Sequence, residues 1–258
     1  MELNLSTKAR ITWCPGCPDN AILVAFRQAV TELVNAGNVK AENVVAMSGI
    51  GCHGKITDYL NLNTFTSLHG RVIPAMTGVK SANPALTVVG FSGDGDSYSE
   101  GLDHLVHAAQ RNSDINLFIH DNQVFALTTG QATSTSRKGF KSKSMPSGTI
   151  EEPFNPLLLM LSAGATFVAR SYAPDMAKTK EIMKAAIAHK GFSFVDIIQP
   201  CLIFNDMRAY YSERLYWLDD KFPTDNVAVA TEKAREDGDK IPFGIFYRTE
   251  KPTFEEQL

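Results

Sequence analysis

The chain has 258 residues, of which 44% are hydrophobic, so it is long enough to bury a substantial core as one large domain. Its net charge of -3 gives no electrostatic reason to expect nucleic acid or an anionic membrane as a partner. No apolar run is long enough to span a bilayer, and residues 1–10 lack the pattern of a signal peptide, so we expect a cytoplasmic protein. Four cysteines are too few for a disulfide scaffold in a chain of this size, which favours a metal or redox use.

The first motif along the chain is C-P-G-C at residues 14–17. Helical spacing of apolar residues predicts a helix over residues 18–35 and a second one over residues 72–82. Between them, residues 43–47 are typical of a buried strand and lead into a turn with three glycines at residues 48–55. A loop at the carboxyl end of a parallel strand lies at the edge of the sheet where ligands bind.

A strand-turn-helix-strand unit follows and carries the most informative pattern. Residues 86–91 are apolar and β-branched, as in a strand buried on both faces; helical spacing predicts a helix over residues 97–110, and residues 115–120 form the next strand. A right-handed crossover brings the carboxyl ends of two parallel strands to the same edge of the sheet. We therefore expect Asp94 and Asn122 to lie side by side, where their oxygens suit a hard divalent cation that holds phosphate.

After Gln131 the chain forms a long polar loop, and such loops in compact enzymes are usually functional or lie against a partner. Helix and strand patterns then alternate, with helices expected at residues 154–163 and 174–189 and strands at residues 166–170 and 192–198. From about residue 202 we expect an irregular or partly helical tail. The alternation predicts a single α/β domain over residues 1–258, built on a mostly parallel sheet flanked by helices.

Two of the four cysteines, Cys52 and Cys201, follow predicted strands at the edge where Asp94 and Asn122 are expected. Cys14 and Cys17 share one turn, Cys52 lies in the glycine-rich turn, and Cys201 follows the strand at residues 192–198. Four soft thiolates suit zinc or an iron-sulfur cluster, and their spacing does not separate the two. A thioredoxin-like redox motif is a rival interpretation of C-P-G-C, but it leaves Cys52 and Cys201 unexplained except as ordinary buried residues.

The G-D-G triplet at residues 93–95, followed by Asn122, resembles the diphosphate-binding motif of thiamine-diphosphate enzymes. The segments WCPGC, GIGCHGKITDY, HGRVIPAMTGVK, GFSGDGD and HDNQVFALTTGQ, in this order before Cys201, resemble the β subunit of 2-oxoacid:ferredoxin oxidoreductases. This family includes the pyruvate and 2-oxoglutarate synthases. The resemblance implies a thiamine-diphosphate-binding fold of the pyrophosphate type, and the coenzyme A-dependent, reversible oxidative decarboxylation of a 2-oxo acid to acyl-CoA and CO₂.

The resemblance also implies roles for particular residues. A [4Fe-4S] cluster would be ligated by Cys14, Cys17, Cys52 and Cys201. Mg²⁺ would be held by Asp94, Asn122 and the main-chain carbonyl of Val124. The other contacts with thiamine diphosphate would be Ile50, Gly51, Cys52, His53, His69, Gly93, Gly95, Asp96, Ala126 and Leu127. Lys55 and His69 would be the catalytic residues beside the substrate.

The family places the glutamate that activates thiamine on a partner α subunit, so we expect a heterodimer that is inactive without that subunit and reduces ferredoxin. Thr129 stands where many relatives have Lys or Gly, which leaves the class of 2-oxo acid open. Two alternatives remain: a non-catalytic iron-sulfur electron carrier or binding subunit, and a zinc-stabilised thiamine decarboxylase or synthase. Turnover that survives Asp94→Ala would favour the first, and zinc without iron would favour the second.

Overall fold

The structure is a computed structural model that describes residues 3–258. The strands are β1 (Val44–Ser48), β2 (Asn63–Thr66), β3 (Thr87–Gly93), β4 (Asn116–Asp121), β5 (Val124–Phe125), β6 (Gln131–Ala132), β7 (Phe167–Tyr172), β8 (Ser193–Ile198), β9 (Leu215–Trp217) and β10 (Ile241–Arg248). The α-helices are α1 (Asp19–Asn35), α2 (Ile56–Tyr59), α3 (Val72–Ala82), α4 (Leu102–Arg111), α5 (Pro156–Ala163), α6 (Met176–Ile187), α7 (Arg208–Arg214) and α8 (Val227–Ala234).

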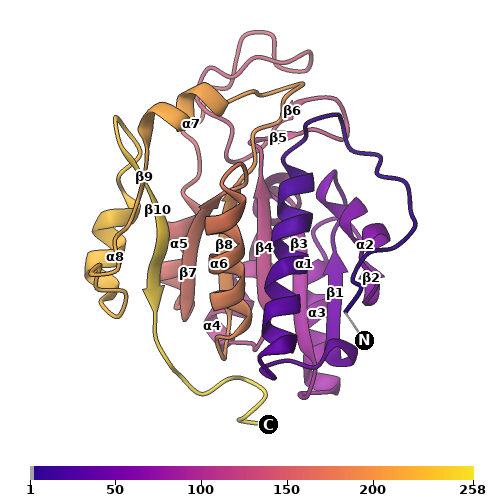
Figure 1. Cartoon of the computed structure of the whole chain (residues 1–258). Helices are drawn as coiled ribbons and strands as arrows, with labels where there is room; N and C mark the ends of the chain where they lie inside the picture. The colour runs from indigo at the N-terminus through magenta and orange to yellow at the C-terminus, as the bar shows by residue number, and fades with distance from the viewer. Residues whose placement is uncertain (1–2) are drawn as a thin grey trace.

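Eight of the strands form one sheet in the order β2-β1-β3-β4-β8-β7-β10-β9, and β5 pairs with β6 in a separate hairpin. Every pair of neighbours in the large sheet is parallel except β7 and β10. Helices α1 and α6 pack together on one face, and α3, α4, α5 and α8 cover the other (Figure 1). The predicted α/β class and mostly parallel sheet are thus confirmed. Across residues 3–258 we find no helix of the length and apolarity that a membrane crossing requires.

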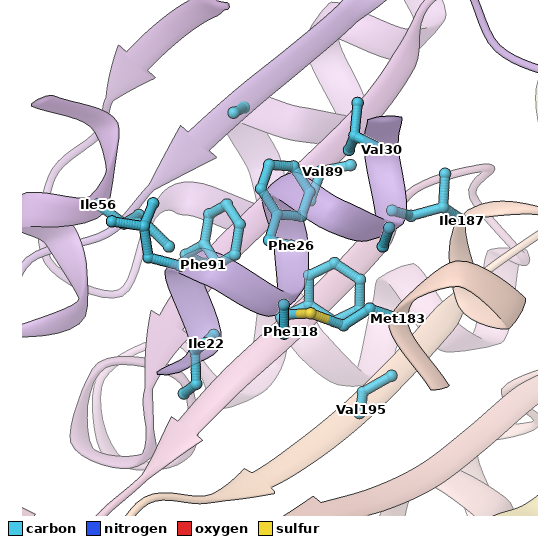
Figure 2. Packing of buried hydrophobic residues seen from close by; sticks show 14 of the residues in the cluster. Ile22, Phe26, Val30, Ile56, Val89, Phe91, Phe118, Met183, Ile187 and Val195 are labelled. Atoms are coloured by element: carbon cyan, nitrogen blue, oxygen red, sulfur yellow. The ribbon is translucent and has the colours of Figure 1, made fainter. Parts of the chain in front are cut away.

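The core under α1 fixes the central strands. Ile22, Phe26 and Val30 recur at four-residue spacing and are buried, so one side of the helix faces the sheet (Figure 2). The Phe26 ring packs edge-on against Phe91 of β3, with ring centroids 4.9 Å apart, and lies near Phe118 of β4. Because these aromatic contacts tie β3 and β4 to the same helix, the carboxyl ends of the two strands are held on a rigid base.

The helix predicted over residues 97–110 is wrong at its beginning. Gly95–Ser99 forms a single π-helical turn, and α4 begins only at Leu102. Gly101 lies between the two, and its backbone is so close to Gly70 that a Cβ would be 2.6 Å from the Gly70 carbonyl oxygen, so this position requires glycine. Single π turns are frequent at functional sites, and this one directly follows Asp94. By contrast, α3 spans the predicted residues 72–82.

The tail after residue 202, expected to be irregular or partly helical, contains two helices, but its strands were not predicted. The tail contains α7, β9, α8 and β10, and β10 joins the main sheet antiparallel to β7. Its pattern was obscured by Pro242 and Gly244, which are uncommon inside strands. Phe243 between them is fully buried against Tyr172 and Trp217.

We expect Phe243→Ala to lower the free energy of unfolding by about 3–5 kcal/mol, because it leaves a cavity among aromatic rings that cannot collapse onto it. Urea unfolding followed by circular dichroism measures the change. Phe222→Ala, at a half-buried position outside the sheet, is the matched control and should cost much less. Equal losses in the two variants would show that β10 is not part of the core.

Candidate functional site

Asp94 and Asn122 follow the carboxyl ends of β3 and β4, which pair in parallel, and they line one cavity as expected. The Asp94 carboxylate is buried and accepts hydrogen bonds from the hydroxyl groups of Thr133 at 2.5 Å and Thr135 at 3.0 Å. Burial raises the pKa of Asp94 to about 6, although the two hydroxyl donors oppose this shift. A nearby cation would favour the ionised form, so the site is suited to a metal ion.

Asn122 belongs to a tight turn that several contacts hold in place. Gln123 has φ of 60°, in the left-handed region, which returns the chain so that the Val124 N–H donates to Asn122 Oδ1 at 3.1 Å. The Gln123 side chain donates to the Tyr211 hydroxyl at 2.6 Å, and the Ser136 hydroxyl donates to the Gln123 carbonyl at 2.6 Å. Carboxylate, amide and carbonyl oxygens are the donors that hard cations prefer, so the donor set fits Mg²⁺.

We call this first cavity the edge cavity. Its lining includes every residue that the resemblance implies as a thiamine contact or magnesium ligand, namely Ile50, Gly51, Cys52, His53, His69, Gly93, Asp94, Gly95, Asp96, Asn122, Val124, Ala126 and Leu127. Phe125 and Thr128 also line it, and no sequence pattern singled out either residue. A Cβ on Gly95 would lie 2.3 Å from the Phe125 ring, so a residue without a side chain is needed there. The structure brings these residues together, and their roles stay predictions.

Asp96 organises the floor of the edge cavity. Its carboxylate accepts hydrogen bonds from Ser92 Oγ at 2.5 Å and from the Gly70 N–H at 2.7 Å. It also lies 3.4 Å from His53 Nε2 and 3.1 Å from His69 Nδ1. Burial acts to raise the pKa of Asp96, but these contacts outweigh it, so the pKa lies below its ordinary value and the group is a carboxylate at neutral pH. Asp96 therefore holds the Nδ1 side of the half-exposed His69 ring.

The four cysteines line a second cavity, which we call the cysteine cavity; it shares Cys52, Asn122 and Ala126 with the edge cavity. In the C-P-G-C turn the Cys17 N–H donates to the Cys14 carbonyl at 3.0 Å, and Gly16 has φ of 76°, which favours glycine. Burial raises the pKa of the Cys17 thiol well above its ordinary value, helped by the charge of Asp19.

Burial likewise raises the pKa of the Cys52 thiol to about 12. Such thiols stay protonated at neutral pH unless a metal replaces their protons, and four sulfur atoms around one cavity are the donors that zinc or an iron-sulfur cluster takes. Within residues 3–258, no group of three or more His, Cys, Asp or Glu side chains is already arranged around a metal position. The residue types of the cavity thus fit either metal centre, with adjustment of side-chain rotamers.

Lys55 does not line the same cavity as His69, the other predicted catalytic residue. It lines the cysteine cavity rather than the edge cavity, and its Nζ donates to the Thr12 carbonyl at 3.2 Å. Two further residues of this region were not singled out from the sequence. Asp19 is buried 2.6 Å from His120 Nδ1, and Gln199 lies between Asn122 and Cys17.

Comparison with known families defines the class of protein. A family model described as "Thiamine pyrophosphate enzyme, C-terminal TPP binding domain" matches residues 49–197, more than half of the chain. A second model, for the C-terminal part of the pyruvate ferredoxin oxidoreductase β chain, matches residues 201–258. The chain is therefore a thiamine-diphosphate-binding α/β protein, and the matched residues include the whole lining of the edge cavity.

Similar proteins narrow the class further. The chain is 43% identical over 262 residues to the β subunit of a 2-oxoacid:ferredoxin oxidoreductase from Sulfolobus sp., covering 95% of this chain and 85% of that protein. It is 40% identical to the 2-oxoglutarate oxidoreductase subunit KorB of Mycobacterium tuberculosis, covering 79% of this chain and 53% of that protein. A solved structure of 2-oxoglutarate:ferredoxin oxidoreductase from Magnetococcus marinus, with 2-oxoglutarate, coenzyme A and succinyl-CoA bound, has a TM-score of 0.94 at 34% identity, covering 98% of this chain and 86% of that one. The chain belongs to the β subunits of the 2-oxoacid:ferredoxin oxidoreductases.

Proposed function

We propose that this β subunit binds thiamine diphosphate, Mg²⁺ and a [4Fe-4S] cluster in an enzyme that converts a 2-oxo acid and coenzyme A to acyl-CoA and CO₂. The cluster, held by Cys14, Cys17, Cys52 and Cys201, would supply one-electron transfer to ferredoxin. The observation that carries the proposal is the common wall of the two cavities, in which Cys52 belongs both to the edge cavity and to the cysteine cavity. An electron donor and a cluster on the two sides of one residue are within transfer reach.

The bound thiamine diphosphate would supply a carbon nucleophile and an electron sink for decarboxylation. In our proposal Asp94, Asn122 and the Val124 carbonyl hold Mg²⁺ and, through it, the diphosphate. His69 transfers a proton at the substrate in this proposal, because Asp96, 3.1 Å from Nδ1, orients the imidazole ring in the edge cavity. The proposed contact of Lys55 with the substrate carboxylate requires its ammonium group to leave the Thr12 carbonyl.

A partner α subunit is part of the proposal. The acidic residues that line the edge cavity, within the described part of the chain, are Asp94 and Asp96, so the glutamate required at the thiamine pyrimidine ring would come from another chain. Ile50 and Leu127 are large apolar residues of the cavity lining that are exposed, and Leu68 beside His69 is 76% exposed. Such residues at a cavity mouth suit a protein contact. We infer that the described residues 3–258 form one domain, because β9 and β10 of the tail belong to the same sheet as β1.

We include coenzyme A and a 2-oxo acid as substrates because the similar structure from Magnetococcus marinus has 2-oxoglutarate, coenzyme A and succinyl-CoA bound. The test is anaerobic co-expression with the α subunit of the same organism. We expect a brown protein that contains iron and reduces viologen only when thiamine diphosphate, coenzyme A and a 2-oxo acid are all present. Pyruvate, 2-oxoglutarate, 2-oxoisovalerate and indolepyruvate identify the substrate class. Zinc in place of iron, or reduction without thiamine, would overturn the proposal.

A pH dependence follows from the proposed role of Asp94. Burial raises the pKa of this carboxyl to about 6, so protons compete with Mg²⁺ below that pH. We expect the affinity for Mg²⁺ and thiamine diphosphate to be constant above pH 7 and to fall about tenfold for each pH unit below pH 6. Isothermal titration calorimetry between pH 5 and pH 8 measures it. An affinity that does not change over this range would exclude Asp94 as the titrating ligand.

A further inference from the structure

Gln199 joins the two cavities through opposite ends of one side-chain amide. The residue directly follows β8 and is 2% exposed. Its Oε1 accepts a hydrogen bond from Asn122 Nδ2 at 3.1 Å, and its Nε2 donates to Cys17 Sγ at 3.5 Å. Its own backbone N–H donates to the Asp121 carbonyl at 2.8 Å, which continues the pairing of β4 with β8 and fixes the position of the side chain.

We propose that Gln199 is a positioning residue that orients the magnesium ligand Asn122 with its carbonyl oxygen and raises the reduction potential of the iron-sulfur cluster with its N–H group. The inference rests on the proposed function, because it assigns Asn122 and Cys17 to the two centres. The Gln199 side-chain amide can contact both Asn122 and Cys17 because its oxygen accepts a hydrogen bond and its nitrogen donates one.

The hydrogen bond between Gln199 and Asn122 determines which atom of the Asn122 side-chain amide faces the proposed Mg²⁺. Asn122 has one oxygen and one NH₂ group, and only the oxygen can bind a cation. Since Gln199 Oε1 accepts from the NH₂ group, the oxygen is directed to the other side, where it meets the Val124 N–H in the edge cavity. Residues that hold a metal ligand in this way commonly contribute about 10–100-fold to metal affinity.

The hydrogen bond from Gln199 Nε2 to Cys17 Sγ affects the negative charge that the proposed cluster can carry. A cluster gains negative charge when it is reduced, and hydrogen bonds donated to its sulfur atoms stabilise that form, so they raise the potential. The other side-chain contact of Cys17 is the Asp19 carboxylate at 3.5 Å, whose negative charge has the opposite effect. Gln199 therefore supplies the donor that offsets Asp19. Because Gln199 is buried, water is poorly placed to substitute for it.

Two variants separate the two ends. Gln199→Leu removes both bonds, and we expect at least about tenfold weaker magnesium-dependent binding of thiamine diphosphate together with a more negative cluster potential. Gln199→Glu keeps an acceptor for Asn122 but cannot donate to Cys17 when ionised. It should lower the potential while thiamine diphosphate affinity stays within about twofold of wild type. Calorimetry measures the affinity, and a redox titration followed by electron paramagnetic resonance measures the potential, both on the αβ holoenzyme.

Gln123→Leu is the matched control, because Gln123 is a second buried glutamine at the same turn that bonds Tyr211 and no cysteine. It should weaken thiamine diphosphate binding and leave the potential at the wild-type value. If Gln199→Leu takes up no iron, the cluster potential and the thiamine diphosphate affinity of Gln199→Glu are compared with those of the wild type instead. A wild-type potential in Gln199→Glu overturns the inference alone. A wild-type protein without iron overturns the proposed function and, with it, this inference.

Discussion

Asp94→Ala is expected to abolish magnesium-dependent binding of thiamine diphosphate and to lower 2-oxo acid oxidation by at least about 100-fold. The buried carboxylate is the one negatively charged member of the proposed Asp94, Asn122 and Val124 ligand set. Alanine removes that charge and leaves the hydroxyl groups of Thr133 and Thr135 directed at a position without an acceptor. Calorimetry with Mg²⁺ and steady-state viologen reduction by the αβ complex measure the two effects.

The matched control for Asp94→Ala is Asp103→Ala. Asp103 lies in the first turn of the neighbouring helix α4, and its side chain is 71% exposed. This variant removes the same group from the surface and should keep wild-type affinity and turnover. Wild-type turnover in Asp94→Ala would instead favour a protein that transfers electrons without an active thiamine.

Cys201→Ser is expected to remove the proposed [4Fe-4S] cluster while it preserves the proposed thiamine site. Cys201 lines the cysteine cavity and is not among the residues that line the edge cavity. Serine oxygen is a poor substitute for a thiolate on iron, so we expect iron content to fall and viologen reduction to drop by on the order of 100-fold. Iron analysis, the visible absorption spectrum and steady-state assays measure these losses.

Calorimetry on the same Cys201→Ser preparation provides the control, because binding of thiamine diphosphate should stay close to wild type. A variant that retains its iron and its turnover would exclude Cys201 as a ligand. A variant that loses both iron and thiamine diphosphate binding would show that the two cavities do not fold independently.

Local patterns in the sequence predicted much of the central sheet. Residues 86–91 and 115–120 are apolar runs that correspond to β3 and β4 within two residues, because strands buried on both faces leave little choice of residue type. The parallel connection between these strands was enough to predict that Asp94 lies beside Asn122. The β subunit family, confirmed by the comparisons, followed from several motifs in order rather than from any single one.

What the sequence missed depends on contacts between distant residues. Gln199 looks like an ordinary polar residue until the fold brings it to Asn122 and to Cys17, which precedes it by 182 positions. Asp19 resembles a helix-start residue, and its contact with His120 spans 101 positions. The strand β10 was missed for a similar reason, because it pairs with β7, which lies far earlier in the chain. Its own proline and glycine also make its sequence atypical of a strand. Hydrophobic periodicity in a sequence indicates which side of a helix or strand is buried, but not which distant residues pack against that side.

The common wall at Cys52 also has a consequence for how this protein family can change over time. The turn that presents Cys52 includes Ile50, Gly51 and His53, all of which line the edge cavity. Substitution of Cys52 would alter the wall of the edge cavity as well as the cysteine cavity, whereas Cys14, Cys17 and Cys201 line the cysteine cavity alone. If the proposed cluster is correct, we therefore expect relatives that lack it to differ at Cys14, Cys17 or Cys201 more readily than at Cys52.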